Sequence, residues 1–221
     1  MSLFAISDLH LSFKANKPMD VFGGRWENYI ETLSNNWNKN VRDEDTVVLC
    51  GDNSWATYLE DADLDFEFIN SLPGKKILSK GNHDYWWTTQ KKMNEFCVDN
   101  NFNTISFLQN NYYMYNDIAI CGTRGWMPDA KDEKIFNREL ERLAISLNAA
   151  KISKPREIIV ALHYPPENAF RKVLENFGVS HCIYGHLHGN AQKNALSGTI
   201  NGVKYLLVSC DYLQFNPFKL Y

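Results

Sequence analysis

One pattern recurs along this sequence of 221 residues: a short apolar segment ends in a cluster of polar residues. The apolar segments are rich in Val, Ile and Leu without alternating polar positions, which is typical of strands buried on both faces. The five segments and their clusters are SLFAIS with Asp8-Leu9-His10, DTVVLC with Gly51-Asp52-Asn53, KKILSK with Gly81-Asn82-His83-Asp84, REIIVAL with His163-Tyr164-Pro165-Pro166, and SHCIY with Gly185-His186-Leu187-His188.

Helical patterns lie between several of these segments. Apolar residues recur at spacings of three and four over residues 25–39, 61–71 and 132–150, which predicts three amphipathic helices. Strands alternating with helices favour an α/β layered fold. In such folds ligands bind beyond the carboxyl ends of the strands, where all five polar clusters are expected. The clusters are therefore predicted to share one site.

Two further strand pairs are expected. The stretch from Tyr112 to Gly122 reads as two strands joined at Asn116-Asp117, and residues 196–209 as a second pair with a turn near Asn201-Gly202. No repeat, low-complexity segment or linker rich in Pro, Gly or Ser divides the chain. We therefore expect a single domain over residues 1–221.

Composition limits the classes of function. With 23 basic and 26 acidic side chains the net charge is −3, which argues against a nucleic-acid partner. The five cysteines form no CxxC pair and are expected to be small buried residues in a reducing compartment. The longest wholly apolar runs, such as IIVAL at 158–162, are too short to span a membrane. We expect a cytoplasmic protein that does not act on membranes.

The polar clusters carry side chains that bind metals. They offer carboxylate, imidazole and carboxamide groups but no thiolate, a set that suits Mn, Fe, Zn, Ni or Co. Five of the six histidines fall inside the clusters, and only His181 lies outside. Incidental core or surface histidines would explain any one of them, but not five at strand ends. The set exceeds the needs of one metal, whereas two metals bridged by a shared carboxylate would use it fully.

The five clusters together resemble the motifs of the calcineurin-like metallophosphoesterases. DLH, GDN, GNHD, the His before YPP, and GHLH occur in the family's order from Asp8 to His188. The resemblance implies a two-sheet β-sandwich flanked by helices in four layers, α/β/β/α. Residues 196–221 would then supply strands of the second sheet.

The resemblance also implies a role for each motif residue. It places one divalent metal on Asp8, His10, Asp52 and His188, and the other on Asp52, Asn82, His163 and His186. His83 would protonate the leaving oxygen or stabilise phosphoryl charge, and Asp84 would orient His83. The implied reaction is hydrolysis of a phosphomonoester or phosphodiester by a metal-bridging hydroxide.

Several points stay open at this level. The stretch GDNSW departs from commoner family members, so the resemblance says less about the substrate wall beside Asp52. Aromatic residues near the motifs either pack in the core or form a rim that stacks on a ring; they are Trp55, Tyr85, Trp86, Trp87, Trp126 and Tyr164. Arg124 either contacts a phosphate or forms a surface salt bridge.

The expected partner is a small-molecule phosphate ester. The alternatives are a non-catalytic scaffold of the same fold and a nuclease, and no feature indicates the oligomeric state.

Overall fold

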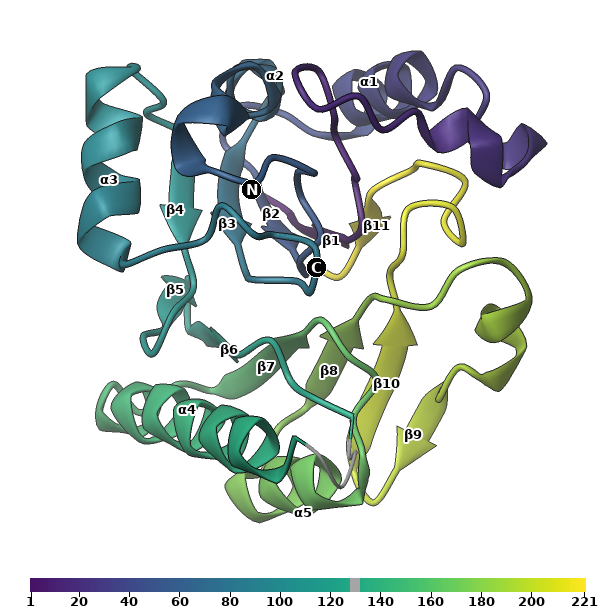
Figure 1. Ribbon diagram of the computed structural model, residues 1–221. Helices are drawn as coiled ribbons and strands as arrows, with labels where there is room; N and C mark the ends of the chain where they lie inside the picture. The colour runs from purple at the N-terminus through teal and green to yellow at the C-terminus, as the bar shows by residue number, and fades with distance from the viewer. Residues whose placement is uncertain (128–131) are drawn as a thin grey trace.

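Two β-sheets pack face to face, with helices on both outer sides, in the computed structural model, which describes residues 1–127 and 132–221 (Figure 1). The first sheet has the strand order β11-β1-β2-β3-β4, and the second has the order β5-β6-β7-β8-β10-β9. The predicted α/β class with a two-sheet sandwich between helices is confirmed.

The first sheet carries most of the early motifs. Its strands are β1 (Leu3–Ile6), β2 (Thr46–Leu49), β3 (Lys75–Leu78), β4 (Ile105–Phe107) and β11 (Phe218–Lys219). β1 to β4 run parallel, and β11 joins β1 in antiparallel pairing. The outer side is covered by α1 (Tyr29–Asn40), α2 (Asp63–Ser71) and α3 (Gln90–Asp99).

The second sheet carries the later motifs. Its strands are β5 (Tyr113–Tyr115), β6 (Ile118–Gly122), β7 (Glu157–Leu162), β8 (His181–Tyr184), β9 (Gly198–Ile200) and β10 (Val203–Leu207). β5 and β9 are antiparallel edge strands, while the four strands between them are parallel. Its outer face is covered by α4 (Glu133–Ile152) and α5 (Asn168–Phe177).

The central strands are buried on both faces, which explains why their sequences lack polar alternation. In β1, Phe4 and Ile6 point into the core beneath the first helical layer, whereas Leu3 and Ala5 point between the two sheets. A third apolar core lies between the second sheet and α4 and α5. The five cysteines are buried and unpaired, as expected.

The predicted elements are present with small shifts. The helix expected at residue 25 begins at Tyr29, because Gly24–Trp26 forms a separate 3-10 turn and Asn28 adopts a left-handed φ of 51° before α1. The turn at Asn201-Gly202 joins β9 to β10 with φ values of 50° and 85°. One placement was wrong: β11, near the end of the chain, pairs with β1 of the first sheet rather than joining the second.

The parts of the chain that the structure describes contain no helix both long enough and apolar enough to cross a membrane.

Candidate metal centre

The motif residues of both sheets meet where the parallel strands end. A bridge between Ser7, after β1, and Ser209, after β10, links the two sheets at this edge. Backbone hydrogen bonds join neighbouring segments within each sheet, from Asp8 N to Gly51 O in the first and from Gly185 N to His163 O in the second. The segments that follow β1, β2, β7 and β8 are therefore held side by side.

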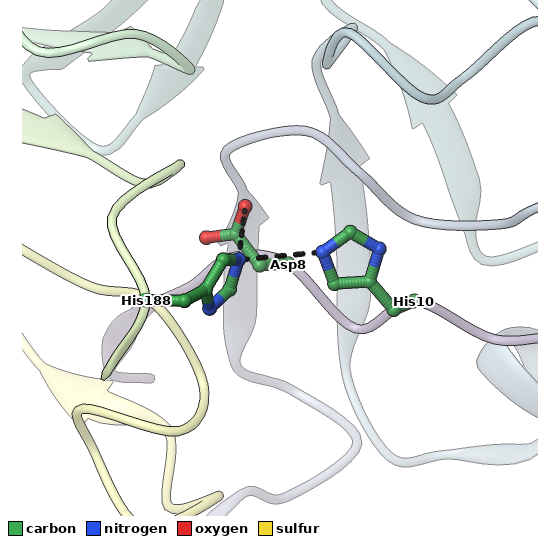
Figure 2. A group of neighbouring side chains, drawn as sticks. All are labelled: Asp8, His10 and His188. Atoms are coloured by element: carbon green, nitrogen blue, oxygen red, sulfur yellow. Dashed lines mark hydrogen bonds and ion pairs between the residues drawn. The ribbon is translucent and has the colours of Figure 1, made fainter. Parts of the chain in front are cut away.

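The first group of potential ligands contains Asp8, His10 and His188. Nε2 of His188 lies 3.3 Å from Nε2 of His10 and 3.7 Å from Oδ1 of Asp8 (Figure 2). Two imidazole nitrogens that face each other at this distance need a shared proton or a cation between them. The three side chains are thus arranged as ligands of one ion, and their donor atoms lie within 4.8 Å of one another.

The second group contains Asn82, His163 and His186. Oδ1 of Asn82 lies 2.6 Å from Nε2 of His163 and 2.9 Å from Nδ1 of His186, and the two ring nitrogens are 3.2 Å apart. Amide oxygen and imidazole nitrogens again converge on one point. Each group alone offers three donors of the kind that transition metals accept.

Asp52 lies between the two groups. Its Oδ2 is 3.5 Å from Nε2 of His163 in the second group and 3.8 Å from Nε2 of His10 in the first. Oδ1 of Asp52 accepts a hydrogen bond of 2.8 Å from the backbone N–H of His83. One carboxylate oxygen therefore faces both groups while the other fixes the orientation of the side chain.

The backbone is strained at these residues. Four residues have φ values in the left-handed region, which residues other than Gly rarely adopt. They are Asp8 at 63°, His10 at 47°, Asp52 at 52° and His186 at 72°. Such conformations cost free energy and cluster at functional sites. The sharp turns bring side chains from the three segments after β1, β2 and β8 into one small volume.

Two glycines make the close approach of the carboxylates possible. A Cβ atom at Gly185 would come within 2.4 Å of Oδ2 of Asp8, and one at Gly81 would overlap Oδ1 of Asp52. The motifs GN and GH therefore require glycine for steric reasons. They leave room for the carboxylates and for what the carboxylates bind.

The protonation states fit a cation site. Burial lowers the pKa values of His10 and His163 far below the usual value and that of His186 to about 4, so these rings are neutral. Burial also raises the pKa of Asp8 to about 6 and that of Asp52 well above its usual value. Neutral imidazoles beside buried carboxylates form a donor set that is costly when empty of positive charge and suited to divalent ions.

Hydrogen bonds on the far side of two rings select the nitrogen that faces the centre. Nδ1 of His163 lies 3.1 Å from the carbonyl of Cys50, and Nδ1 of His188 lies 2.8 Å from Oδ1 of Asp211. Both Nε2 atoms are then free to act as ligands. Asp211 was not predicted from the sequence, although it also follows an apolar segment, LLVSC, which begins within β10.

His83 lies beside the first group rather than within it. Its ring centroid is 5.7 Å from that of His10 and 4.2 Å from the ring of Trp55, and its side chain lines a cavity of about 940 Å³. Nδ1 of His83 has no hydrogen-bond partner among the residues that the structure describes. The ring is therefore placed next to the centre, with Nδ1 buried and part of the side chain facing the cavity.

The expected contact between Asp84 and His83 was wrong. The buried Asp84 carboxylate accepts hydrogen bonds from the side chains of Asn53 and Trp86 and from four backbone N–H groups. The backbone donors are Gly81, Asp52, Asn53 and Ser54, at 2.7 to 3.2 Å. Asp84 fastens the loop after β3 to the loop after β2, and so supports Asp52 and Asn82 instead of orienting His83.

Some aromatic residues near the motifs pack in the core, and others lie at the cavity. Trp86 and Trp87 are buried in the core beneath the first helical layer, whereas Trp55 lines the cavity. Tyr164 is buried against the ring of His186, at 4.4 Å between centroids, and Tyr85 is exposed.

Arg124 pairs with a carboxylate, but not at the surface. Its Nη2 lies 3.6 Å from Oε1 of the buried Glu139, and its guanidinium lies over the ring of Trp126 at 4.3 Å.

Solved structures with a similar fold support the architecture. A protein of unknown function from Aquifex aeolicus superposes with a TM-score of 0.54 at 19% identity, covering 99% of this chain and 95% of that one. A phosphopantetheinyl hydrolase from Mycobacterium tuberculosis gives 0.52 at 14% identity, covering 94% and 88%. The sulfate thiohydrolase SoxB from Thermus thermophilus gives 0.51 at 13% identity, covering 95% and 52%.

The sequence itself establishes the family. Among curated protein sequences none matches this chain. The model of the calcineurin-like phosphoesterase family matches residues 1–190, a span that contains all five motifs and both groups of potential ligands. The chain therefore belongs to the calcineurin-like phosphoesterase family, whose members are metal-dependent hydrolases.

Proposed function

We propose that this chain is a phosphohydrolase that holds two divalent metal ions and cleaves a small-molecule phosphomonoester or phosphodiester. The observation that carries the proposal is the position of Asp52, whose Oδ2 faces His10 of one donor group and His163 of the other. A carboxylate shared between two sets of metal-binding side chains is the arrangement that a two-metal site requires.

The side chains of the site would have separate roles in metal binding and in proton transfer. Asp8, His10 and His188 would hold one ion with Asp52, and Asn82, His163 and His186 the other. When bound, such ions lower the pKa of a water molecule and offset the charge of the phosphoryl group. His83, at the wall of the cavity, is placed to donate a proton to the leaving oxygen or to bind a phosphoryl oxygen.

The donor set favours transition metals. Imidazole nitrogens outnumber carboxylates in both groups, which suits Mn, Fe, Zn, Ni or Co better than Ca, a metal bound through oxygen. We propose Mn²⁺ as the first ion to supply in assays. Both the first and the second group lack thiolates, so a purely structural zinc site is disfavoured.

The two alternative functions, a non-catalytic scaffold and a nuclease, would each require different features of the chain. A non-catalytic scaffold would have no need for a strained, buried ligand set with His83 lining a cavity beside it. A nuclease would gain from a basic surface, whereas this chain has a net charge of −3. Neither alternative has a feature of its own that favours it.

The test uses purified protein loaded with Mn²⁺. Metal content is measured by mass spectrometry, and hydrolysis is followed with nitrophenyl phosphate and bis-nitrophenyl phosphate, before and after chelation. We expect about two metals per chain and hydrolysis that is lost with the metals and restored by Mn²⁺. Asp52→Asn should abolish hydrolysis, while Asp99→Asn, an exposed acid at the end of α3, serves as the matched control. Metal-loaded protein that hydrolyses neither ester would overturn the proposal.

A further inference from the structure

The cavity beside the first donor group is much larger than a phosphate needs. It measures about 940 Å³, a volume typical of sites that enclose a whole small molecule. His10, His83 and His188 are among its lining residues. A phosphoryl group bound beside these histidines would leave most of the cavity volume to the rest of the substrate.

Aromatic and apolar side chains form part of the remaining wall. Trp55 stacks on His10 with 5.0 Å between centroids and 25° between planes, and Trp26 meets His10 and His188 edge-on at 5.9 and 5.7 Å. Phe22 and Tyr212 also line the cavity, with 68% and 49% of their surface exposed. Large apolar side chains left in water beside a concave site are suited to covering an apolar ligand.

Positive charge lies along the same wall. Arg25 and Lys193 line the cavity, and the ammonium of Lys17 lies 4.7 Å from the ring centroid of Trp55. Among the residues that the structure describes, Asp211 is the one carboxylate of the lining, and it is already engaged by His188 and by the side chain of Gln192. Arg25 and Lys193 form no ion pair within the described part of the chain, so both can meet a second anionic group of the ligand.

The wall is connected to the donor group through hydrogen bonds. Nη1 of Arg25 lies 3.4 Å from Oε1 of Gln192, whose Nε2 donates to Oδ2 of Asp211 at 2.7 Å. Asp211 in turn accepts from Nδ1 of His188. The segment before α1, the 3-10 helix Gly189–Asn194 and the ligand His188 thus form one connected surface. A ligand on this wall would be held in a fixed relation to the centre.

We propose that the site takes phosphate esters whose alcohol carries a flat, ring-containing apolar body and a second anionic group. This inference rests on the proposed function and names its substrate class. The ring body lies between Trp55, Trp26 and the exposed faces of Phe22 and Tyr212. The second anionic group lies near Arg25 and Lys193. A nucleoside base and a simple arene share this chemistry, and the test separates them.

The test compares esters with leaving alcohols of similar acidity. Three probes are ethyl phosphate, 2-(naphthyl)ethyl phosphate, and the same naphthyl ester with a carboxylate on its ring. Uridine and adenosine 5′-monophosphates are the probes that carry a nucleoside base. We expect kcat/KM for the naphthyl ester to exceed that for ethyl phosphate by at least about tenfold, and the carboxylate to raise it further. Faster turnover of the nucleotides than of the naphthyl esters would assign the ring to a base, and the reverse would assign it to an arene.

Substitutions of aromatic residues test whether the cavity wall causes the preference for the naphthyl ester. Phe22→Ala and Tyr212→Ala should lower the ratio of the naphthyl to the ethyl rate constant by about three- to tenfold. Tyr58→Ala, an equally exposed aromatic that does not line the cavity, should leave that ratio at the wild-type value. A ratio near one in the wild type, or the same fall in Tyr58→Ala, would overturn the inference while hydrolysis itself stands.

A binding measurement separates this inference from the proposed function. Non-hydrolysable naphthylethyl and ethyl phosphonates are titrated into Mn²⁺-loaded protein while tryptophan fluorescence is recorded. Selective binding of the naphthyl phosphonate without hydrolysis of any ester would support the cavity and refute the phosphohydrolase. Equal affinity for the two phosphonates would refute the proposed ring site.

Discussion

Asp211 accepts a hydrogen bond from Nδ1 of His188 over 2.8 Å, and Nε2 of the same ring faces Asp8 and His10. Burial works to lower the pKa of His188, but the bond to Asp211 and the charge of Asp8 outweigh it, and the pKa is raised. The carboxylate fixes the tautomer and makes the ring a stronger ligand.

We therefore expect Asp211→Asn to weaken metal binding by about 10- to 100-fold, as is usual for the partner of a ligand His. Titration calorimetry with Mn²⁺ measures the affinity, and circular dichroism checks the fold. Asp99→Asn is the control. Wild-type affinity in Asp211→Asn would show that the ring needs no partner to bind.

His83→Ala should keep both metals and lose turnover by about 10²- to 10⁴-fold, the usual effect of removing a general acid. The ring lies beside the first donor group without belonging to either group. The loss should be smaller for a nitrophenyl ester, whose leaving group needs little protonation, than for an alkyl ester. Loss of metal in this variant would make His83 a ligand. Equal slowing of both esters would assign it to phosphoryl binding alone.

Metal affinity should fall as the pH falls toward 6. Burial raises the pKa of Asp8 to about 6 and that of Asp52 well above its usual value, and the pKa of His188 is also raised, so metal-free protein gains protons here as the pH falls toward 6. A metal must displace these protons, and each proton released costs about tenfold in affinity per pH unit below the pKa of its group.

The pKa of His186, at about 4, keeps that ring neutral over the same range, so it releases no proton when metal binds. Calorimetry at pH 5.5, 6.5 and 7.5, in two buffers of different ionisation enthalpy, gives the affinity and the number of protons released. Constant affinity across this range, with no proton release, would contradict the assignment of these carboxylates as ligands.

Asp84→Ala should lower the free energy of unfolding of the metal-free protein by roughly 3–5 kcal/mol, because several buried N–H groups would lose their acceptor. Urea denaturation measures the change, with Asp99→Ala expected within about 0.5 kcal/mol of wild type. A change below about 1 kcal/mol together with lost turnover would restore Asp84 as the partner of His83.

The sequence predicted the α/β class and the meeting of the motifs because both follow from short-range rules, whereas the two-sheet sandwich was implied by the family resemblance. Strands buried on both faces have continuous apolar sequences, and parallel strands place their carboxyl ends at one edge. The turn at Asn201-Gly202 followed in the same way, from residues that accept positive φ.

The details that the sequence did not predict depend on contacts between distant segments. Asp84 directly follows His83, yet its carboxylate turns to the backbone of residues 52–54, some thirty positions away. Asp211 reaches His188 from the end of another strand, and Trp26 joins the cavity although its spacing fits a helix. The position of a residue next to a motif in the sequence does not show which distant residue its side chain contacts.

The central claim is that Asp52 is shared by two metals, and one measurement tests it directly. Mn²⁺ is titrated into metal-free wild type, Asp52→Asn and Asp8→Asn, and the stoichiometry and affinity of each site are determined by calorimetry. We predict two sites per chain in the wild type, the loss or weakening of both in Asp52→Asn, and a mainly one-site defect in Asp8→Asn, because a neutral amide cannot offset the charge of two ions. Two sites of wild-type affinity in Asp52→Asn, or one site in the wild type, would contradict the claim.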